Sequence, residues 1–197
     1  MTASQRPDRR LVWIDVAIKV GTVALLGWAV LNPDLPQFTS KAFAGRALGY
    51  PIALLVVPVA WWFVGRPRGI AFPVVVDILL GLPFLIDVAG NAANLYDTIE
   101  WWDDANHLVN WFLHTAGVTV LLGLGSWGRW TRVGLAIGWA ASTAILWEVA
   151  EYVAFVQNSP EAATAYGDTI GDLALGLLGG TIAAVLVSGL SASRPRL

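Results

Sequence analysis

The chain has 197 residues, of which 56% are hydrophobic and only 13% are charged, and its mean hydropathy is +0.63. Soluble domains carry about 25% charged residues, so this composition excludes an ordinary soluble protein and indicates a polytopic membrane protein. The formal net charge is −2, and no basic stripe of the kind that binds nucleic acid is present. The absence of cysteine excludes disulfides, thiolate catalysis and cysteine-based metal sites.

Six segments are long and apolar enough to cross a bilayer. In chain order they cover residues 11–31, 48–64, 70–96, 106–126, 133–155 and 169–191. Prolines at 51 and 58 in the second segment, and at 73 and 83 in the third, predict kinks there. We therefore expect an all-α fold, in which residues 1–197 form a single domain of six transmembrane helices.

The basic residues predict the orientation of these helices, because cytoplasmic loops are enriched in Lys and Arg. Arginines occur in alternate connections, at Arg6, Arg9 and Arg10, Arg66 and Arg68, Arg129 and Arg132, and Arg194 and Arg196. The other connections contain Lys41 and Arg46 as their basic residues and are otherwise acidic. Aromatic residues fit two interfacial belts, with Trp13, Trp61, Trp62, Trp127 and Trp130 inside and Trp28, Trp101, Trp102 and Tyr166 outside. Both termini are thus predicted to be cytoplasmic.

Small residues recur every four positions in the last two predicted spans. Gly134, Gly138 and Ser142 do so in the fifth, and Gly176 and Gly180 do so in the sixth. Such spacing lets helix backbones approach closely in membranes. We expect this packing to occur within the bundle, and a homo-oligomer is the alternative.

Ionisable residues gather at those ends of the apolar segments that should share the outer side of the membrane. Three predicted helices each carry a pair spaced three or four residues apart, a spacing that places both side chains on one helical face. The candidate metal ligands are Asp103, His107, Glu148, Glu151, Asp168 and Asp172. The residues expected around them are Asp87, Asn91, Asp97, Asp104 and His114.

Two interpretations of this constellation remain open. In the first, the carboxylates and a neutral imidazole bind a divalent ion such as Zn, Mn, Mg or Fe, as in carboxylate-bridged helical bundles. In the second, the groups have separate duties: Asp103 and Asp168 cap helices, and Glu148 or Glu151 is protonated and hydrogen-bonded. Capping does not explain two glutamates inside an apolar run, so we favour a shared polar site. Near the other side of the membrane, Asp15 and Lys19 are expected to form an ion pair that Asp77 can join.

A set of short motifs in the second half of the chain is similar to a known family. The motifs are Tyr96-Asp97, Asp103-x-x-x-His107, Glu148-x-x-Glu151, Gly167-Asp168-Thr-x-x-Asp172 and the glycines Gly176, Gly179 and Gly180. In these the chain resembles the YjdF-type bacterial inner-membrane proteins and, more distantly, the VanZ-like group. The resemblance implies a helical domain of the bacterial cytoplasmic membrane whose polar motifs meet. The VanZ-like connection to glycopeptide resistance suggests envelope lipids or peptidoglycan precursors as ligands.

The leading functional hypothesis is an intramembrane site that faces the outside of the cell, binds a divalent metal ion and acts on an envelope lipid. A transporter or channel is the second hypothesis, with the same acids relaying protons or ions. A structural subunit of a larger membrane complex is the third. The sequence leaves the reaction, and whether there is one, undetermined.

Overall fold

Every regular element in the computed structural model is helical within residues 8–192, which are the residues that the structure describes. The α-helices are α1 (Arg9–Leu31), α2 (Phe43–Ala60), α3 (Val74–Ala92), α4 (Leu95–Thr98), α5 (Trp102–Leu122), α6 (Arg129–Ala154) and α7 (Ala165–Ala192). Four short helical segments are η1 (Trp61–Gly65), η2 (Arg66–Arg68), η3 (Val156–Asn158) and η4 (Pro160–Ala163). The predicted all-α class is confirmed.

The six long helices correspond one to one to the six predicted spans. Five of them are long and apolar enough to cross a membrane: α1, α2 with its continuation to Arg68, α3, α6 with its continuation to Asn158, and α7. The exception is α5, whose first half carries several ionisable and amide side chains. This helix packs against α3, α6 and α7, so much of its surface faces protein.

Prolines shape the second and third long helices, although not all of them as expected. Pro51 and Pro58 lie inside α2, and the π-helical turn η1 begins three residues after Pro58, where the ring has removed a backbone donor. Of the two prolines in the third predicted span, Pro83 lies inside α3, whereas Pro73 precedes the first residue of that helix and cannot kink it. That helix also ends earlier than predicted, at Ala92, and Asn94 adopts a left-handed conformation with φ 58°.

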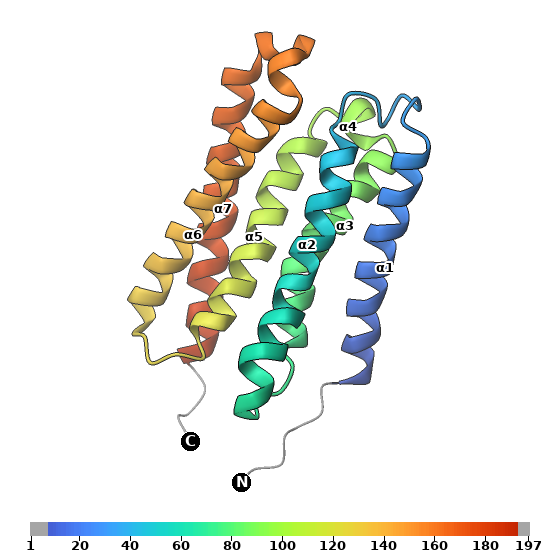
Figure 1. Ribbon diagram of the computed structural model, residues 1–197. Helices are drawn as coiled ribbons and strands as arrows, with labels where there is room; N and C mark the ends of the chain where they lie inside the picture. The colour runs from blue at the N-terminus through green and yellow to red at the C-terminus, as the bar shows by residue number, and fades with distance from the viewer. Residues whose placement is uncertain (1–7, 193–197) are drawn as a thin grey trace.

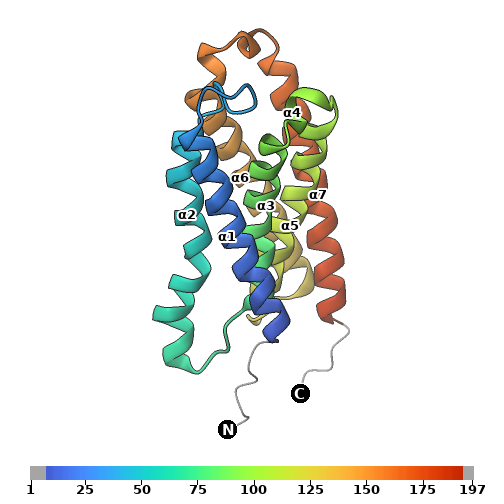
Figure 2. The ribbon, with the colours of Figure 1, turned by 90° about the vertical axis from the view of Figure 1, so that its right-hand side faces the viewer.

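The helices form two groups that pack side by side (Figures 1 and 2). One consists of α1, α2 and α3, the other of α5, α6 and α7, and contacts between α3 and α5 join them. The beginnings of α1, α3 and α6 lie at one end of the bundle together with the last residues of α2, α5 and α7 (Figure 1). The arginines of η2 and of the first turn of α6 are therefore at the end where α1 begins. Arg6, Arg194 and Arg196 lie outside the described residues.

Close packing between α7 and its neighbours depends on glycine. A Cβ atom on Gly179 would lie 2.1 Å from the backbone oxygen of Leu108, and one on Gly180 would lie 2.4 Å from the Cβ atom of Ala140. In contrast, a Cβ atom on Gly134 or Gly138 would meet nothing within 4 Å. The expected packing within the bundle therefore holds for α7 and is wrong for the glycines of α6, which face outward.

The predicted ion pair between Asp15 and Lys19 is present near the end where α1 begins. The Lys19 ammonium group also donates to Asp77 Oδ2 on α3 at 2.8 Å, so two carboxylates share one lysine. Both carboxylates are buried, whereas the lysine side chain is 22% exposed. The triad links α1 to α3 and is remote in sequence from the acidic loop residues.

Candidate metal centre

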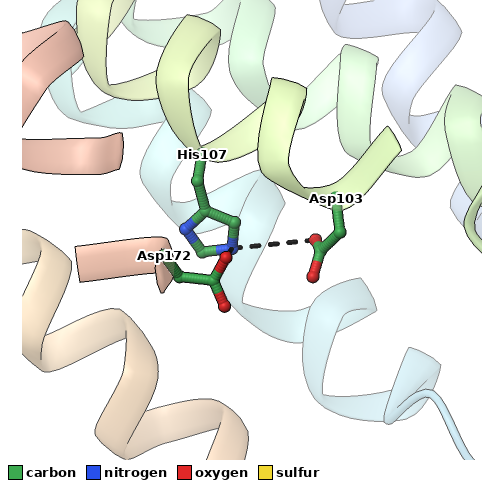
Figure 3. Close-up of side chains that lie close together, drawn as sticks. All are labelled: Asp103, His107 and Asp172. Carbon is green, nitrogen blue, oxygen red and sulfur yellow. Dashed lines mark ion pairs between the residues drawn. The ribbon is translucent and has the colours of Figure 1, made fainter. Parts of the chain in front are cut away.

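The imidazole of His107 lies at the centre of the predicted cluster. It projects from α5 and is buried, and its Nε2 atom lies 3.7 Å from Asp103 Oδ1 and 3.7 Å from Asp172 Oδ1 (Figure 3). Its Nδ1 atom lies 3.7 Å from Glu148 Oε1 and has no hydrogen-bond partner among the described residues. Carboxylates from three helices thus surround both nitrogens of a single ring.

Two sets of possible ligand atoms share this ring. Asp103, His107 and Asp172 form one set, and His107, Glu148 and Glu151 form the other; within each set the atoms lie within 4.8 Å of one another. Five of the six predicted ligands are therefore brought together. The sixth, Asp168, lies one turn before Asp172 on the same helix and is exposed.

Local structure explains how the five residues meet. Asp103 and His107 are one helical turn apart on α5. Helix α7 approaches α5 closely at Gly176, where an added Cβ atom would lie 2.5 Å from the Trp111 ring, and this places Asp172 beside His107. The Thr169 hydroxyl of α7 donates to the Glu148 carboxylate of α6, so all three helices are tied together at this end of the bundle.

The capping roles that the alternative interpretation assigned are not found. The N-cap of α5 is Trp101, without a side-chain hydrogen bond, and Asp103 lies in the first turn. Helix α7 begins at Ala165, so Asp168 also lies within the first turn and is not an N-cap. Acidic residues in a first turn still complement the helix dipole, but neither aspartate is the N-cap of its helix.

The residues expected around the ligands divide into three kinds. Asp87 and Asn91 are buried on α3, where the Asn91 amide donates to the Asp87 backbone oxygen at 3.0 Å. Asp97 and Asp104 are exposed, and both Asp97 oxygens accept from Lys41, at 2.7 and 2.8 Å. His114 lies deeper in the bundle, donates to the Leu80 backbone carbonyl and packs against aromatic rings.

Arg46 is part of the site although the sequence placed it in a loop. Helix α2 begins at Phe43, five residues before the predicted span, and this carries Arg46 into the bundle. Its Nη1 atom lies 3.7 Å from Asp87 Oδ2, and its Nη2 atom lies 3.5 Å from Glu151 Oε1. One signal was available: Arg46 was a rare basic residue on the predominantly acidic side of the predicted topology.

Two tyrosines complete the surroundings of Asp87. The Tyr50 hydroxyl donates to Asp87 Oδ2 at 2.6 Å, and the Tyr96 hydroxyl donates to Asp87 Oδ1 at 3.1 Å. Burial and the neighbouring Asp87 charge raise the pKa of Tyr96 well above its usual value, so this phenol stays protonated and remains a donor. The Asp87 carboxylate is therefore fully hydrogen-bonded and is poorly placed to be a metal ligand.

Negative charge accumulates around Asp103. Its side chain lies in the first turn of α5, ahead of the apolar part of that helix. The carboxylates of Asp168, Asp87 and Asp104 lie near enough to repel its charge. A cation bound beside Asp103 would relieve this repulsion.

Two cavities adjoin the cluster. The outer one has a volume of about 320 Å³ and is lined by six acidic side chains and by two basic ones, Lys41 and Arg46. The inner one has a volume of about 60 Å³ and extends from Asp103 and His107 to His114. Both cavities share Tyr96, Asp103 and Glu151 in their walls, so the cluster lies between an acidic outer space and a smaller inner space.

The apolar helices and the buried ionisable cluster define a helical membrane protein with a polar site at one end of its bundle. Residues 14–193 match the family described as predicted membrane protein (DUF2238), and the chain belongs to that family. This is the YjdF-type family, so that part of the resemblance is confirmed. The VanZ-like similarity stays a prediction. No curated protein and no solved structure matches the chain.

Proposed function

We propose that this protein binds a divalent metal ion through Asp103, Asp172 and the Nε2 atom of His107, and that Glu148 accepts a hydrogen bond from Nδ1 of the same ring. The arrangement of carboxylates around both nitrogens of His107 is the observation that carries the proposal. A metal-bound histidine usually donates its other ring N–H to a carboxylate or a carbonyl. Glu148 lies where that acceptor is needed.

The geometry fits an ion after small side-chain movements. Two ligand atoms that are each about 2.1 Å from an ion lie roughly 3.4 Å apart at a tetrahedral angle. The distances from Nε2 to the two aspartate oxygens are both 3.7 Å. The Asp103 side chain is 46% exposed and free to rotate toward His107, and a shift of a few tenths of an ångström between His107 and Asp172 completes the approach.

The alternative set, which uses Nδ1 with Glu148 and Glu151, is less suitable. Glu151 already faces the Arg46 guanidinium at 3.5 Å, and a cation bound there would compete with that charge. Asp168 lines the outer cavity and is available to ligands that enter from outside. Carboxylate and imidazole ligands suit Zn, Mn or Fe, and Mg to a lesser degree.

We place the protein in the bacterial cytoplasmic membrane with six transmembrane helices and both termini in the cytoplasm. The arginines of η2 and of the start of α6 support this orientation, because they lie at the end of the bundle where α1 begins. In this orientation the cluster faces the outside of the cell. A polar α5 can span the membrane because its neighbours cover it.

An envelope lipid is the ligand class that suits an ion at this depth. The outer cavity is large enough to receive a polar headgroup, and apolar side chains of α6 such as Val149 and Val153 are exposed beside it. When bound, the metal ion would supply a Lewis acid that polarises a phosphoryl or carbonyl oxygen. Glu151, which faces Arg46 and is outside the proposed ligand set, is a carboxylate of the cluster that could accept a proton.

Ion transport and a purely structural role remain the competing functions. Transport needs a polar path from the cluster to the triad of Asp15, Lys19 and Asp77. Gly81, which lies on α3 between these two regions, has the apolar side chains of Leu54 and Ile18 as its neighbours. This apolar contact favours ion binding over conduction.

A binding titration with a matched pair of variants tests the metal proposal. Asp103 and Asp104 are adjacent in the first turn of α5, but only Asp103 belongs to the proposed ligand set. We expect Asp103→Asn to weaken Mn²⁺ or Zn²⁺ binding at least ten-fold in equilibrium dialysis, and Asp104→Asn to change it less than three-fold. Equal affinities for both variants would contradict the proposal.

A further inference from the structure

Aromatic side chains from four helices and α4 form the walls of the inner cavity. They are Tyr50 from α2, Phe84 from α3, Tyr96 from α4, Trp111 from α5 and Trp147 from α6. Ring centroids of Tyr50 and Phe84 are 4.7 Å apart, and those of Tyr50 and Trp147 are 6.2 Å apart. The faces of such rings attract cations. The cavity therefore differs from the acidic outer cavity in its chemistry.

Two buried polar atoms on the walls of this cavity have no hydrogen-bond partner among the described residues: Asn110 Oδ1 and His114 Nε2. The Asn110 amide nitrogen donates to Asn106 at 3.3 Å, and His114 donates to the Leu80 carbonyl. The remaining atom of each side chain is thus an acceptor. Buried polar atoms without partners are rare and require an explanation, and a ligand that donates hydrogen bonds would provide it.

The charge of the cavity walls indicates whether this ligand is an anion, a neutral molecule or a cation. Asp87, Asp103 and Glu151 line the cavity. Arg46 faces Asp87 and Glu151 from outside the cavity walls, so Asp103 is the wall carboxylate that has no ion pair with a lysine or arginine among the described residues. An anion is repelled by this carboxylate and by the aromatic faces, and a neutral donor is attracted less strongly than a cation by either of them. A cation gains from both.

We infer that the inner cavity binds a primary ammonium group, with its N–H groups directed to Asn110 and His114 and its charge facing the aromatic rings. A volume of about 60 Å³ at roughly 10–15 Å³ for each water-sized group accommodates about four to six such groups. Ethylammonium, with three non-hydrogen atoms, and ethanolammonium, with four, both fit in this volume. A quaternary ammonium ion has no N–H to donate, and a divalent metal ion would lose its hydration to aromatic walls.

This ammonium site adjoins the proposed metal centre, because Asp103 and His107 also line the inner cavity, but its polar partners Asn110 and His114 are not among the metal ligands. His114 is seven residues after His107 on α5, which corresponds to about 10 Å along the helix axis. At that distance both cations can be bound together. The inference stands whether or not the metal proposal is correct, and its test uses protein from which metal has been removed.

The two sources of a primary ammonium group are a small free amine and the headgroup of an aminophospholipid. Both present the same –NH₃⁺ chemistry, but they reach the cavity differently. A free amine enters through the outer cavity, whereas a headgroup would remain attached to its lipid in the bilayer. The experiment therefore includes an arm for each source.

The test is calorimetric titration of the full chain, purified in detergent and treated with EDTA, with ethylammonium chloride. Trp111 and Trp147 lie in the cavity wall, so tryptophan fluorescence gives a second readout. We expect saturable binding that is at least ten-fold tighter than that of ethanol, the neutral analogue, and of tetramethylammonium. Phe84→Leu should weaken it about ten-fold, because one cation–π contact contributes a factor of that order.

The control variant is Phe63→Leu, since Phe63 is 71% exposed on η1 and remote from the cavity. It should bind ethylammonium as the wild type does. Asn110→Ala provides a second test if Phe84→Leu lowers the melting temperature, and should also weaken binding. No binding, equal binding of ethanol, or preference for tetramethylammonium would each overturn the inference.

The source is then identified in lipid nanodiscs. Nanodiscs that contain phosphatidylethanolamine should compete with ethylammonium if a lipid headgroup is the natural ligand, and those that contain only phosphatidylglycerol should not. Full binding of ethylammonium in both would assign the site to a free amine. Loss of metal binding in Asp172→Asn without any change in ethylammonium binding would show that the two sites are independent.

Discussion

The contact between α5 and α7 holds the proposed metal ligands together, and Gly179→Ala tests it. A methyl group at this position would lie 2.1 Å from Leu108 O and 3.0 Å from the Leu108 carbonyl carbon. Carbon and oxygen atoms in van der Waals contact are normally about 3.3 Å apart. The backbones would have to separate by roughly 1.2 Å, because the atoms that are struck belong to the α5 main chain and not to a flexible side chain.

The cost follows from two opposing effects. Inserting a methyl group into a well-packed contact costs about 1–3 kcal/mol, and more where no side chain can yield. Replacing glycine by alanine inside a helix returns up to about 1 kcal/mol. We therefore expect a net loss of about 2 kcal/mol, which corresponds to a fall of roughly 4–8 °C in Tm for a chain of this size.

Gly138→Ala is the matched control, because the same substitution on α6 meets nothing within 4 Å. It should leave Tm unchanged or raise it slightly. Thermal unfolding of both variants in one detergent, followed by tryptophan fluorescence, gives the comparison. Melting of Gly179→Ala within 1 °C of Gly138→Ala would refute the close approach of α5 and α7.

Two further predictions concern the buried cations. Lys19→Met leaves two buried carboxylates without their shared lysine and should lower the unfolding free energy by about 3 kcal/mol. The control is Lys41→Met, which removes an exposed ion pair and should lower it by less than about 1 kcal/mol. Similar losses for the two variants in unfolding by SDS would contradict the buried triad. Arg46→Met should also destabilise the protein by about 3 kcal/mol, and adding Glu151→Gln should restore part of that loss, since it removes a charge that Arg46 balances. An additive double variant would argue against this pair.

Residue spacing and apolar length were sufficient to predict much of this molecule. The six segments correspond to the six long helices, and the spaced pairs on α5 and α6 meet Asp172 of α7 at one end of the bundle, whereas Asp168 stays outside the cluster. Spacing of this kind is a local property of a helix. The Lys19 triad was also predictable, because a lysine in an apolar helix needs a carboxylate within reach.

The features that the sequence did not predict are those that depend on how the helices pack against one another. Arg46 was assigned to a loop because hydropathy alone marks the start of a span too late, when a charged side chain enters the bundle and is paired there. Gly138, which faces outward, and Gly180, which faces inward, share the same four-residue pattern, so only tertiary packing distinguishes them. The inner aromatic cavity likewise draws side chains from five helices that are far apart in sequence.

The metal content of the purified protein is the most direct test of a resident divalent cation at His107. The measurement is inductively coupled plasma mass spectrometry of the wild type and of Asp172→Asn, both extracted from membranes without added metal. The account predicts close to one Zn, Mn or Fe ion per wild-type chain and less than a tenth of that in the variant. A wild type that contains no stoichiometric metal, and takes up none on incubation with these ions, would contradict it.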